Sequence, residues 1–234
     1  MDFALALRNI TVIAFDADDT LWVNEPYFQE TERKFCALLE DYLPHHTISQ
    51  ELYKTEVQNM ALYGFGVKAF MLSMVETAIR ISGGTLPNEI LDKVIQYGKE
   101  HLEKPVEMLD DVEHVLKSLN GKYRIVLATK GDILDQERKL KKSRLERYFH
   151  HTEIMSDKQE ADYLKLIRHL DITPDQFLMI GNSIKSDVLP VLAIGGHAIH
   201  VPFHTTWVHE QVDPKITHPQ FLQVETLAGI LEFL

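Results

Sequence analysis

The sequence predicts an α/β fold in which a doubly wound parallel sheet is interrupted by an inserted helical domain. An apolar, β-branched run at residues 10–15 is typical of a buried strand, and further runs of this kind alternate with helical segments after residue 105. Between them, residues 24–103 carry helical periodicity without an intervening strand pattern. We therefore expect an α/β core of residues 1–22 and 105–234 and a helical cap of residues 23–104.

The first strand is followed directly by an unusual acidic segment. Residues 10–15 read ITVIAF, and both faces of such a strand are apolar, as in the middle of a parallel sheet. The run ends in Asp16-Ala17-Asp18-Asp19-Thr20. Three acids at the end of a buried strand are more than a simple turn requires, so this segment is a candidate site.

Four helices are expected in the inserted domain. Pro26 suits the first turn of the first helix, and Ser49 is a candidate cap for the second. The Gly64-Phe65-Gly66 and Gly83-Gly84 breaks then separate the second, third and fourth helices, and the fourth begins near Pro87. The insertion is therefore predicted to be entirely helical.

Strands and helices alternate in the rest of the chain. The expected strands are residues 123–128, 152–155, 177–180 and, as the last strand, 198–201; the clearest helices are residues 110–120 and 160–170. This alternation is typical of a Rossmann-like sheet with helices on both faces.

Composition and charge exclude several classes of function. The 234 residues carry a formal net charge of −11, which disfavours binding to nucleic acid or to an anionic membrane surface. No apolar run approaches the roughly 18 residues of a membrane span, and the N-terminus lacks the features of a secretion signal. Cys36 is the single cysteine and is expected in the core of the cap. We expect a soluble, cytoplasmic protein.

Polar side chains follow the predicted strands at the edge where ligands of doubly wound sheets bind. Most of them are acids, hydroxyls and lysines, the groups that hold a cation and a phosphate. They are Asp16, Asp18 and Thr20 after the first strand, then Thr129 and Lys130, then Lys158, and finally Asn182 and Asp187. The sequence thus predicts a combined metal and phosphate site.

These four segments resemble the motifs of a known superfamily. In chain order they are residues 16–20 (DADDT), residues 129–131 (TKG), Lys158 and residues 181–187 (GNSIKSD). The chain resembles the haloacid dehalogenase-like hydrolases over nearly its whole length. Among them it is most similar to the phosphatases with an α-helical (C1-type) cap, and residues 24–103 correspond to that cap.

The resemblance implies a chemistry for the motif residues. Asp16 would be the nucleophile that forms an aspartyl-phosphate, and Asp18 would be the general acid and base. Lys158 would neutralise the nucleophile and the transferring oxygens, while Thr129, Lys130 and Thr20 would contribute to phosphate binding. The expected substrate is a small phosphorylated metabolite.

The resemblance also implies a magnesium site. Mg²⁺ suits an all-oxygen set made of Asp16, the carbonyl of Asp18, and Asn182 or Asp187. Asn182 stands where many relatives have aspartate, which removes one negative charge from the site. Asp19 stands where glycine is more common, and we expect its side chain to point away from the site.

Each motif residue also has a simpler interpretation. Lys158 could be a solvated lysine beside ordinary helix caps, and Asp187 could merely complement a helix N-terminus. In the cap, Phe65 and Lys68 are candidate substrate-specificity residues, although the same segment could be only a turn between helices. A further group, His197, His200, His204 and His209, could bind zinc but more simply has packing or surface roles.

Three other functions remain open at this stage. A 2-haloacid dehalogenase would also use an aspartate nucleophile but needs neither Asp18 nor the Asn182 and Asp187 pair. A phosphomutase would share all the core motifs. A phospho-accepting signalling module would also group acids, a threonine and a lysine at strand ends, but it would not need a cap.

Overall fold

The computed structural model describes residues 7–212 and 215–234, which form two compact units. One unit comprises the described residues up to Glu25, the segment Val106–Lys130 and the described residues from Gln136 onward. The other comprises Pro26–Pro105 together with Gly131–Asp135. The sequence had placed the boundaries at residues 22/23 and 104/105 and had left residues 131–135 in the core.

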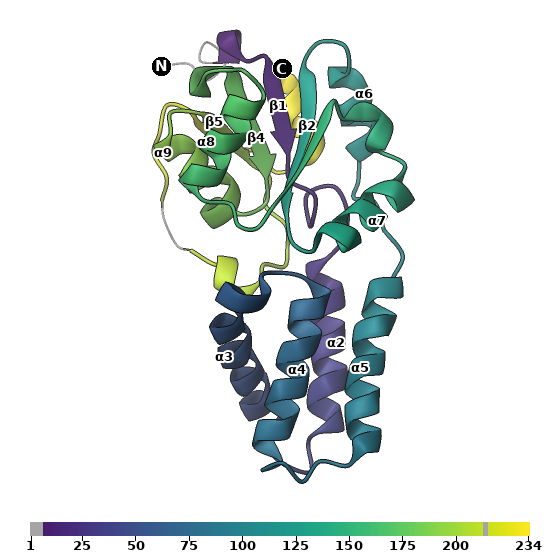
Figure 1. The fold of residues 1–234 in the computed structure, drawn as a ribbon. Helices are drawn as coiled ribbons and strands as arrows, with labels where there is room; N and C mark the ends of the chain where they lie inside the picture. Colours follow the sequence, from purple (N-terminus) through teal and green to yellow (C-terminus); the bar gives the residue numbers. More distant parts are fainter. Residues whose placement is uncertain (1–6, 213–214) are drawn as a thin grey trace. The chain divides into compact units, whose positions relative to one another are not determined.

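The first unit contains a parallel six-stranded sheet, so the predicted α/β class is confirmed (Figure 1). The strand order is β3-β2-β1-β4-β5-β6, and every neighbouring pair is parallel. The strands are β1 (Val12–Phe15), β2 (Arg124–Lys130), β3 (His151–Met155), β4 (Phe177–Gly181), β5 (His197–His200) and β6 (Phe221–Gln223). From β1 the chain adds β2 and β3 on one side of the sheet and then β4, β5 and β6 on the other side. Ligands of such sheets usually bind where the two halves meet, at the carboxyl ends of β1, β2 and β4.

Alternate residues of the strands build two separate apolar layers. Ile13 and Phe15 of β1 pack on the face covered by α6 (Val112–Leu119), α7 (Ile133–Ser143) and the C-terminal turn η6 (Leu227–Glu232). Val12 and Ala14 pack on the opposite face, covered by α8 (Glu160–His169) and α9 (Leu189–Ala193). Since β1 is apolar on both faces, it is fully buried in the middle of the sheet.

The second unit is a bundle of four helices with its own core. They are α2 (Glu25–Leu38), α3 (His45–Tyr63), α4 (Val67–Ile81) and α5 (Asn88–Glu103). Phe35, Leu52 and Met74 are among the fully buried core side chains, and Cys36 lies with them as predicted. Within the parts of the chain that the structure describes, none of the helices has the length and apolarity to cross a bilayer.

Two sequence predictions about elements were wrong. Ser49 does not cap α3, because the extended backbone of Pro44 starts the helix at His45, one turn earlier. The hydroxyl of Ser49 instead donates to Glu32 on α2. Residues 198–201 are not the last strand, because Phe221–Gln223 adds β6 to the edge of the sheet.

Candidate active site

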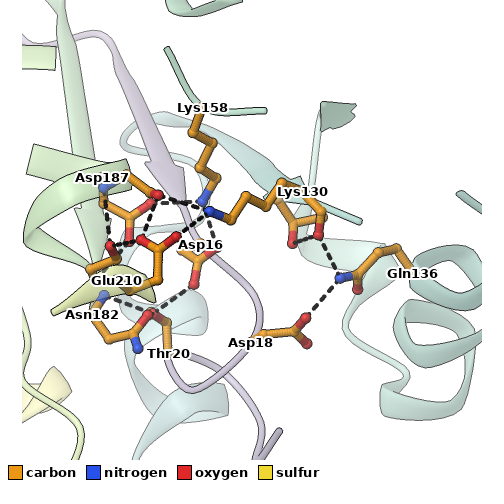
Figure 2. Close-up of polar contacts among 12 residues, drawn as sticks. Asp16, Asp18, Thr20, Lys130, Gln136, Lys158, Asn182, Asp187 and Glu210 are labelled. Atoms are coloured by element: carbon orange, nitrogen blue, oxygen red, sulfur yellow. Dashed lines mark hydrogen bonds and ion pairs between the residues drawn. The ribbon is translucent and has the colours of Figure 1, made fainter. Parts of the chain in front are cut away.

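The centre of the site is a buried lysine held between two carboxylates (Figure 2). Asp16 immediately follows β1, and its Oδ1 lies 2.5 Å from Nζ of Lys158. The same ammonium lies 2.7 Å from Oδ1 of Asp187. Lys158 is only 1% exposed, so its interpretation as a solvated capping lysine was wrong.

The charges of this triad depend on one another. Burial lowers the pKa of Lys158, but Asp16 and Asp187 outweigh it, and the net direction is upward. Burial also raises the pKa of Asp16, and Asp187 adds to that rise, while Lys158 opposes it. A cation next to Asp16 would favour its ionised, nucleophilic form. The triad therefore holds a charged lysine against a carboxylate that a further cation would activate.

Three oxygen atoms converge next to Asp16 in a way that fits a divalent cation. The side-chain amide of Asn182 lies 3.2 Å from both Oδ2 of Asp16 and the backbone oxygen of Asp18. Turned one way, its NH₂ donates to these oxygens; turned the other way, its Oδ1 completes a three-oxygen set. Neighbouring ligands of an octahedral Mg²⁺ are about 2.9 Å apart at bond lengths of 2.0–2.1 Å. The donor set thus fits Mg²⁺ in chemistry, and the two 3.2 Å separations from the amide of Asn182 are close to that spacing.

Thr20 connects the two ends of this oxygen set. Its hydroxyl oxygen lies 3.1 Å from Oδ2 of Asp16 and 3.2 Å from the side-chain amide of Asn182, and it accepts from the backbone N–H of Asn182. The hydroxyl of Thr20 therefore has its hydrogen-bond partners within the protein. Its contact with a phosphate, expected from the motif, stays a prediction.

Asp187 reaches Lys158 because Gly181 leaves room for it. A Cβ built at Gly181 would lie 2.2 Å from Oδ2 of Asp187, so any side chain there would displace the carboxylate. Asp187 lies in a single π-helical turn, η4 (Ile184–Val188), and its Oδ2 accepts the backbone N–H of Ser183 at 3.0 Å. Asp187 thus both complements the start of this turn and contacts the buried lysine.

The carboxylate of Asp18 faces away from the triad, towards α7 (Figure 2). It accepts hydrogen bonds from Nε1 of Trp22 at 2.7 Å, Nε2 of Gln136 at 2.8 Å and Nζ of Lys139 at 2.6 Å. The backbone oxygen of the same residue lies beside Asn182. Asp18 therefore presents its carbonyl to the cation position and its carboxylate to three donors.

Asp19 points away from the site, as expected for a position where glycine is more common. Its φ of +61° is in the left-handed region that explains why glycine suits this position. The carboxylate accepts the backbone N–H groups of Asn24 and Glu25, where α2 begins. Burial raises the pKa of Asp19 to about 7, against the effect of these two hydrogen bonds. Asp19 therefore caps a helix.

Lys130 is engaged by a residue that the sequence did not indicate. Its Nζ lies 2.5 Å from Oε1 of Glu210 and 2.9 Å from Oγ of Ser186. The other oxygen of Glu210 accepts from the hydroxyls of Ser183 and Ser186. Glu210 lies in the short turn η5 (Val208–Glu210), outside all four motifs, and no local pattern marks it. The role of Lys130 in binding phosphate stays a prediction, as does that of Thr129, which is buried at the end of β2.

We expect Glu210 to stabilise the fold in a pH-dependent way. Burial raises the pKa of Glu210, but Lys130 and the two serine hydroxyls outweigh it and hold the pKa at about 2, below the usual 4.5. A pKa that is lower in the folded state stabilises the fold above about pH 4.5, and this contribution is lost as the pH falls towards 2. Glu210→Gln should therefore lower the free energy of unfolding at pH 7 by up to about 3 kcal/mol.

Urea unfolding of the parent and of Glu210→Gln at pH 7, 4 and 3 would measure this difference. The gap should shrink at pH 3, whereas Glu225→Gln, at an exposed position, should show little gap at any pH. A gap for Glu210→Gln that does not change with pH would contradict the assignment.

The candidate specificity residues lie in the helical unit. Lys68 forms an ion pair of 2.9 Å with Asp132, which belongs to the same unit. A Cβ at Gly66 would lie 3.2 Å from the backbone nitrogen of Asp132, so the turn before α4 packs closely on this residue. Phe65, in the same turn, is half-buried. The turn therefore adjoins the segment that directly follows Thr129 and Lys130 in sequence.

In the parts of the chain that the structure describes, the histidines of the C-terminal region form no group close enough to share a metal ion. His200 contacts the side chain of Gln223 and the backbone oxygen of Asn182, and His209 contacts Lys185. Burial lowers the pKa of His197. Among the described residues, the one group of metal-binding side chains close enough to share an ion is His151, Glu153 and His169, which the sequence had not singled out.

A family model for haloacid dehalogenase-like hydrolases matches residues 10–195, which include all four motifs. The chain belongs to this family. A haloacid dehalogenase-like family hydrolase from Xanthomonas campestris supports the assignment, with 34% identity and a TM-score of 0.84 over 94% of this chain and 88% of that chain. The protein is therefore a hydrolase of this family, as its motifs suggested.

More distant structures share the fold but differ in described activity. A predicted phosphoglycolate phosphatase from Haemophilus somnus has 15% identity and a TM-score of 0.63, covering 97% of this chain and 98% of that chain. A 2-haloacid dehalogenase from Pseudomonas syringae has 16% identity and a TM-score of 0.62, covering 96% and 97%. No curated protein matches the sequence significantly. The choice between the two chemistries therefore depends on the residues of the site.

Proposed function

We propose that this hydrolase is a Mg²⁺-dependent phosphatase that acts on a small phosphorylated metabolite through an aspartyl-phosphate on Asp16. The observation that carries the proposal is the oxygen set formed by Asp16, the backbone of Asp18 and Asn182, next to the contact between Asp16 and Lys158. A bound Mg²⁺ would supply positive charge for the phosphate oxygens, which the acidic chain would otherwise repel.

The reaction would proceed in two steps, formation and hydrolysis of the aspartyl-phosphate. In the first, an oxygen of Asp16 bonds to phosphorus while the bond to the leaving oxygen breaks, and Asp18, in its protonated form, gives that oxygen its proton. In the second, Asp18 takes a proton from water as the water oxygen attacks phosphorus, which releases phosphate and restores Asp16. Lys158 stays charged throughout and offsets the negative charge of the nucleophile and of the phosphoryl oxygens.

Asp18 must take up a proton and change partners before the first step. Its carboxylate accepts from Trp22, Gln136 and Lys139, so it would exchange at least one of these donors for the leaving oxygen. Lys139 also donates to the side chain of Asn24 at 3.1 Å, which gives its ammonium another partner when Asp18 turns. This exchange is a local side-chain movement.

The same residues favour a phosphatase over a dehalogenase. Hydrolysis of a carbon–halogen bond releases a halide, which needs no proton from a general acid and no cation to bind phosphate oxygens. Asp18 and the oxygen set at Asn182 would have no purpose in that reaction. They have a direct purpose when the leaving group is an alkoxide and the substrate is a phosphate.

We expect the enzyme to release phosphate from a simple aryl phosphate only with a divalent cation. Mg²⁺ should support turnover, Mn²⁺ should substitute for it, and chelation should abolish it, because the donor set is all oxygen. Colorimetric phosphate release, measured beside halide release from a 2-haloacid, would test this. Undiminished phosphate release after exhaustive chelation, or halide release in place of phosphate release, would overturn the proposal.

The variant Asn182→Asp refines the same experiment. An aspartate would add a negative charge to the oxygen set, so half-maximal activity should need less Mg²⁺. An unchanged Mg²⁺ requirement would show that residue 182 is not a ligand, and Asp187 would then be the alternative.

The helical unit supports a proposal about the rest of the substrate. The motif residues of the α/β unit account for the phosphoryl group alone, so we propose that Phe65 and Lys68 help to recognise the remainder. Lys68 forms an ion pair with Asp132, a residue of the same unit that follows Thr129 and Lys130 closely in sequence. A panel of phosphorylated metabolites would identify the preferred substrate.

A further inference from the structure

Strand β3 and helix α8 bring three metal-binding side chains together at the edge of the sheet. His151, Glu153 and Met155 alternate along β3, so their side chains share one face. Met155 packs in the apolar layer with Leu166 and Ile167 of α8, which shows that α8 covers this face. The helix therefore lies above the two polar residues of the strand.

The direction of α8 explains the third member of the group. Because β3 and β4 are both parallel to the rest of the sheet, the helix that connects them runs back towards the start of β3. Its last residue is His169, and the ring of His169 lies 4.9 Å from that of His151, centroid to centroid. The fold itself thus places His169 over the beginning of the strand.

The ligand atoms have separations that suit a single ion. Nε2 of His151 lies 2.9 Å from Oε2 of Glu153, and Nδ1 of His169 lies 3.8 Å from the same oxygen. All three ligand atoms are within 4.8 Å of one another. Ligands of a tetrahedral zinc ion with bonds of 2.0–2.1 Å are about 3.3 Å apart, so small side-chain rotations would complete the site.

We propose that His151, Glu153 and His169 form a second metal site, which binds Zn²⁺ or a similar first-row transition-metal ion. Two imidazoles and one carboxylate favour such an ion over Mg²⁺, which prefers oxygen ligands. His169 lies in the last turn of α8, where the helix dipole also favours a cation. The half-exposed position leaves the remaining coordination positions to water.

This site is separate from the proposed phosphatase centre and does not depend on it. The catalytic candidates follow the carboxyl ends of the strands, whereas His151 begins β3 and Glu153 lies in its middle. A metal here would link the edge strand to the helix that covers it. Its expected consequence is therefore stabilisation of the folded state, with no requirement for turnover.

Equilibrium dialysis against Zn²⁺ with a large excess of Mg²⁺ would test the proposal. The parent should bind one more Zn²⁺ than His169→Ala at the same free concentration, and the variant should lose at least about tenfold in affinity at this site. His114→Ala, which removes an exposed histidine from α6, is the matched control and should bind like the parent. Glu153→Gln should weaken binding without removing an imidazole.

Two further readouts distinguish a built site from general binding by surface histidines. Co²⁺ should give the visible absorption of a tetrahedral site in the parent and in His114→Ala, but not in His169→Ala. Zn²⁺ should also raise the melting temperature of the parent more than that of His169→Ala. Equal Zn²⁺ binding by the parent and His169→Ala, or equal losses in His169→Ala and His114→Ala, would overturn the proposal.

Discussion

Replacement of Asp16 by asparagine should remove phosphate release almost completely while leaving the fold intact. The amide has the shape of the carboxylate but cannot form the acyl phosphate, so the covalent route is lost. We expect a decrease on the order of 10³-fold or more, equivalent to about 4 kcal/mol of barrier. Steady-state phosphate release from an aryl phosphate, with saturating Mg²⁺, is the measurement.

A matched aspartate separates this effect from a general loss of charge. Asp171→Asn alters an exposed residue at the end of α8 with φ of +55°, a conformation that asparagine also tolerates. It should retain parental activity. If Asp16→Asn kept more than about a tenth of the activity, Asp16 could not be the nucleophile.

Lys158→Met should produce the largest loss of stability among single substitutions at the site. Lys158 is buried between Asp16 and Asp187, and its removal would leave two buried carboxylates facing each other. Breaking a buried ion pair in this way costs about 3–5 kcal/mol. Urea unfolding at pH 7 should show this cost, and added Mg²⁺ should recover part of it by binding next to Asp16.

A surface lysine provides the control for that experiment. Lys34 pairs with Glu30 on α2, and both side chains are more than one third exposed. Lys34→Met should therefore cost no more than about 1 kcal/mol. Similar losses for Lys158→Met and Lys34→Met would contradict the view that Lys158 compensates buried charge.

The fold was largely predictable because its strands are buried on both faces. The run at residues 10–15 is apolar throughout, and the structure places Val12–Phe15 in the centre of the sheet. β6 escaped prediction because Phe221–Gln223 is only three residues long and partly exposed at the edge. The start of α3 was predicted wrongly because Ser49 has the chemistry of an N-cap. The extended backbone of Pro44 instead starts the helix at His45.

Parts of the candidate site were predictable and parts were not. Asp16, Lys158 and Asn182 belong to short motifs at strand ends, so sequence alone could select them. Glu210 and Lys139 were missed because their partners, Lys130 and Asp18, are 80 and 121 residues away in the chain. His151 and Glu153 lie on one face of β3, and His169 joins them only because α8 runs back over the start of this strand. Contacts between distant side chains require the folded arrangement.

The most direct test of the central claim is to trap the phosphoryl group on Asp16. In Asp18→Asn, an aryl phosphate with a good leaving group should still react, since departure of such a group needs little protonation, while hydrolysis of the aspartyl-phosphate should slow. Acid quenching followed by peptide mass spectrometry should then find one phosphoryl group on the peptide that contains Asp16. A phosphoryl group on another residue, or its absence from Asp16 while phosphate is still released, would contradict the account.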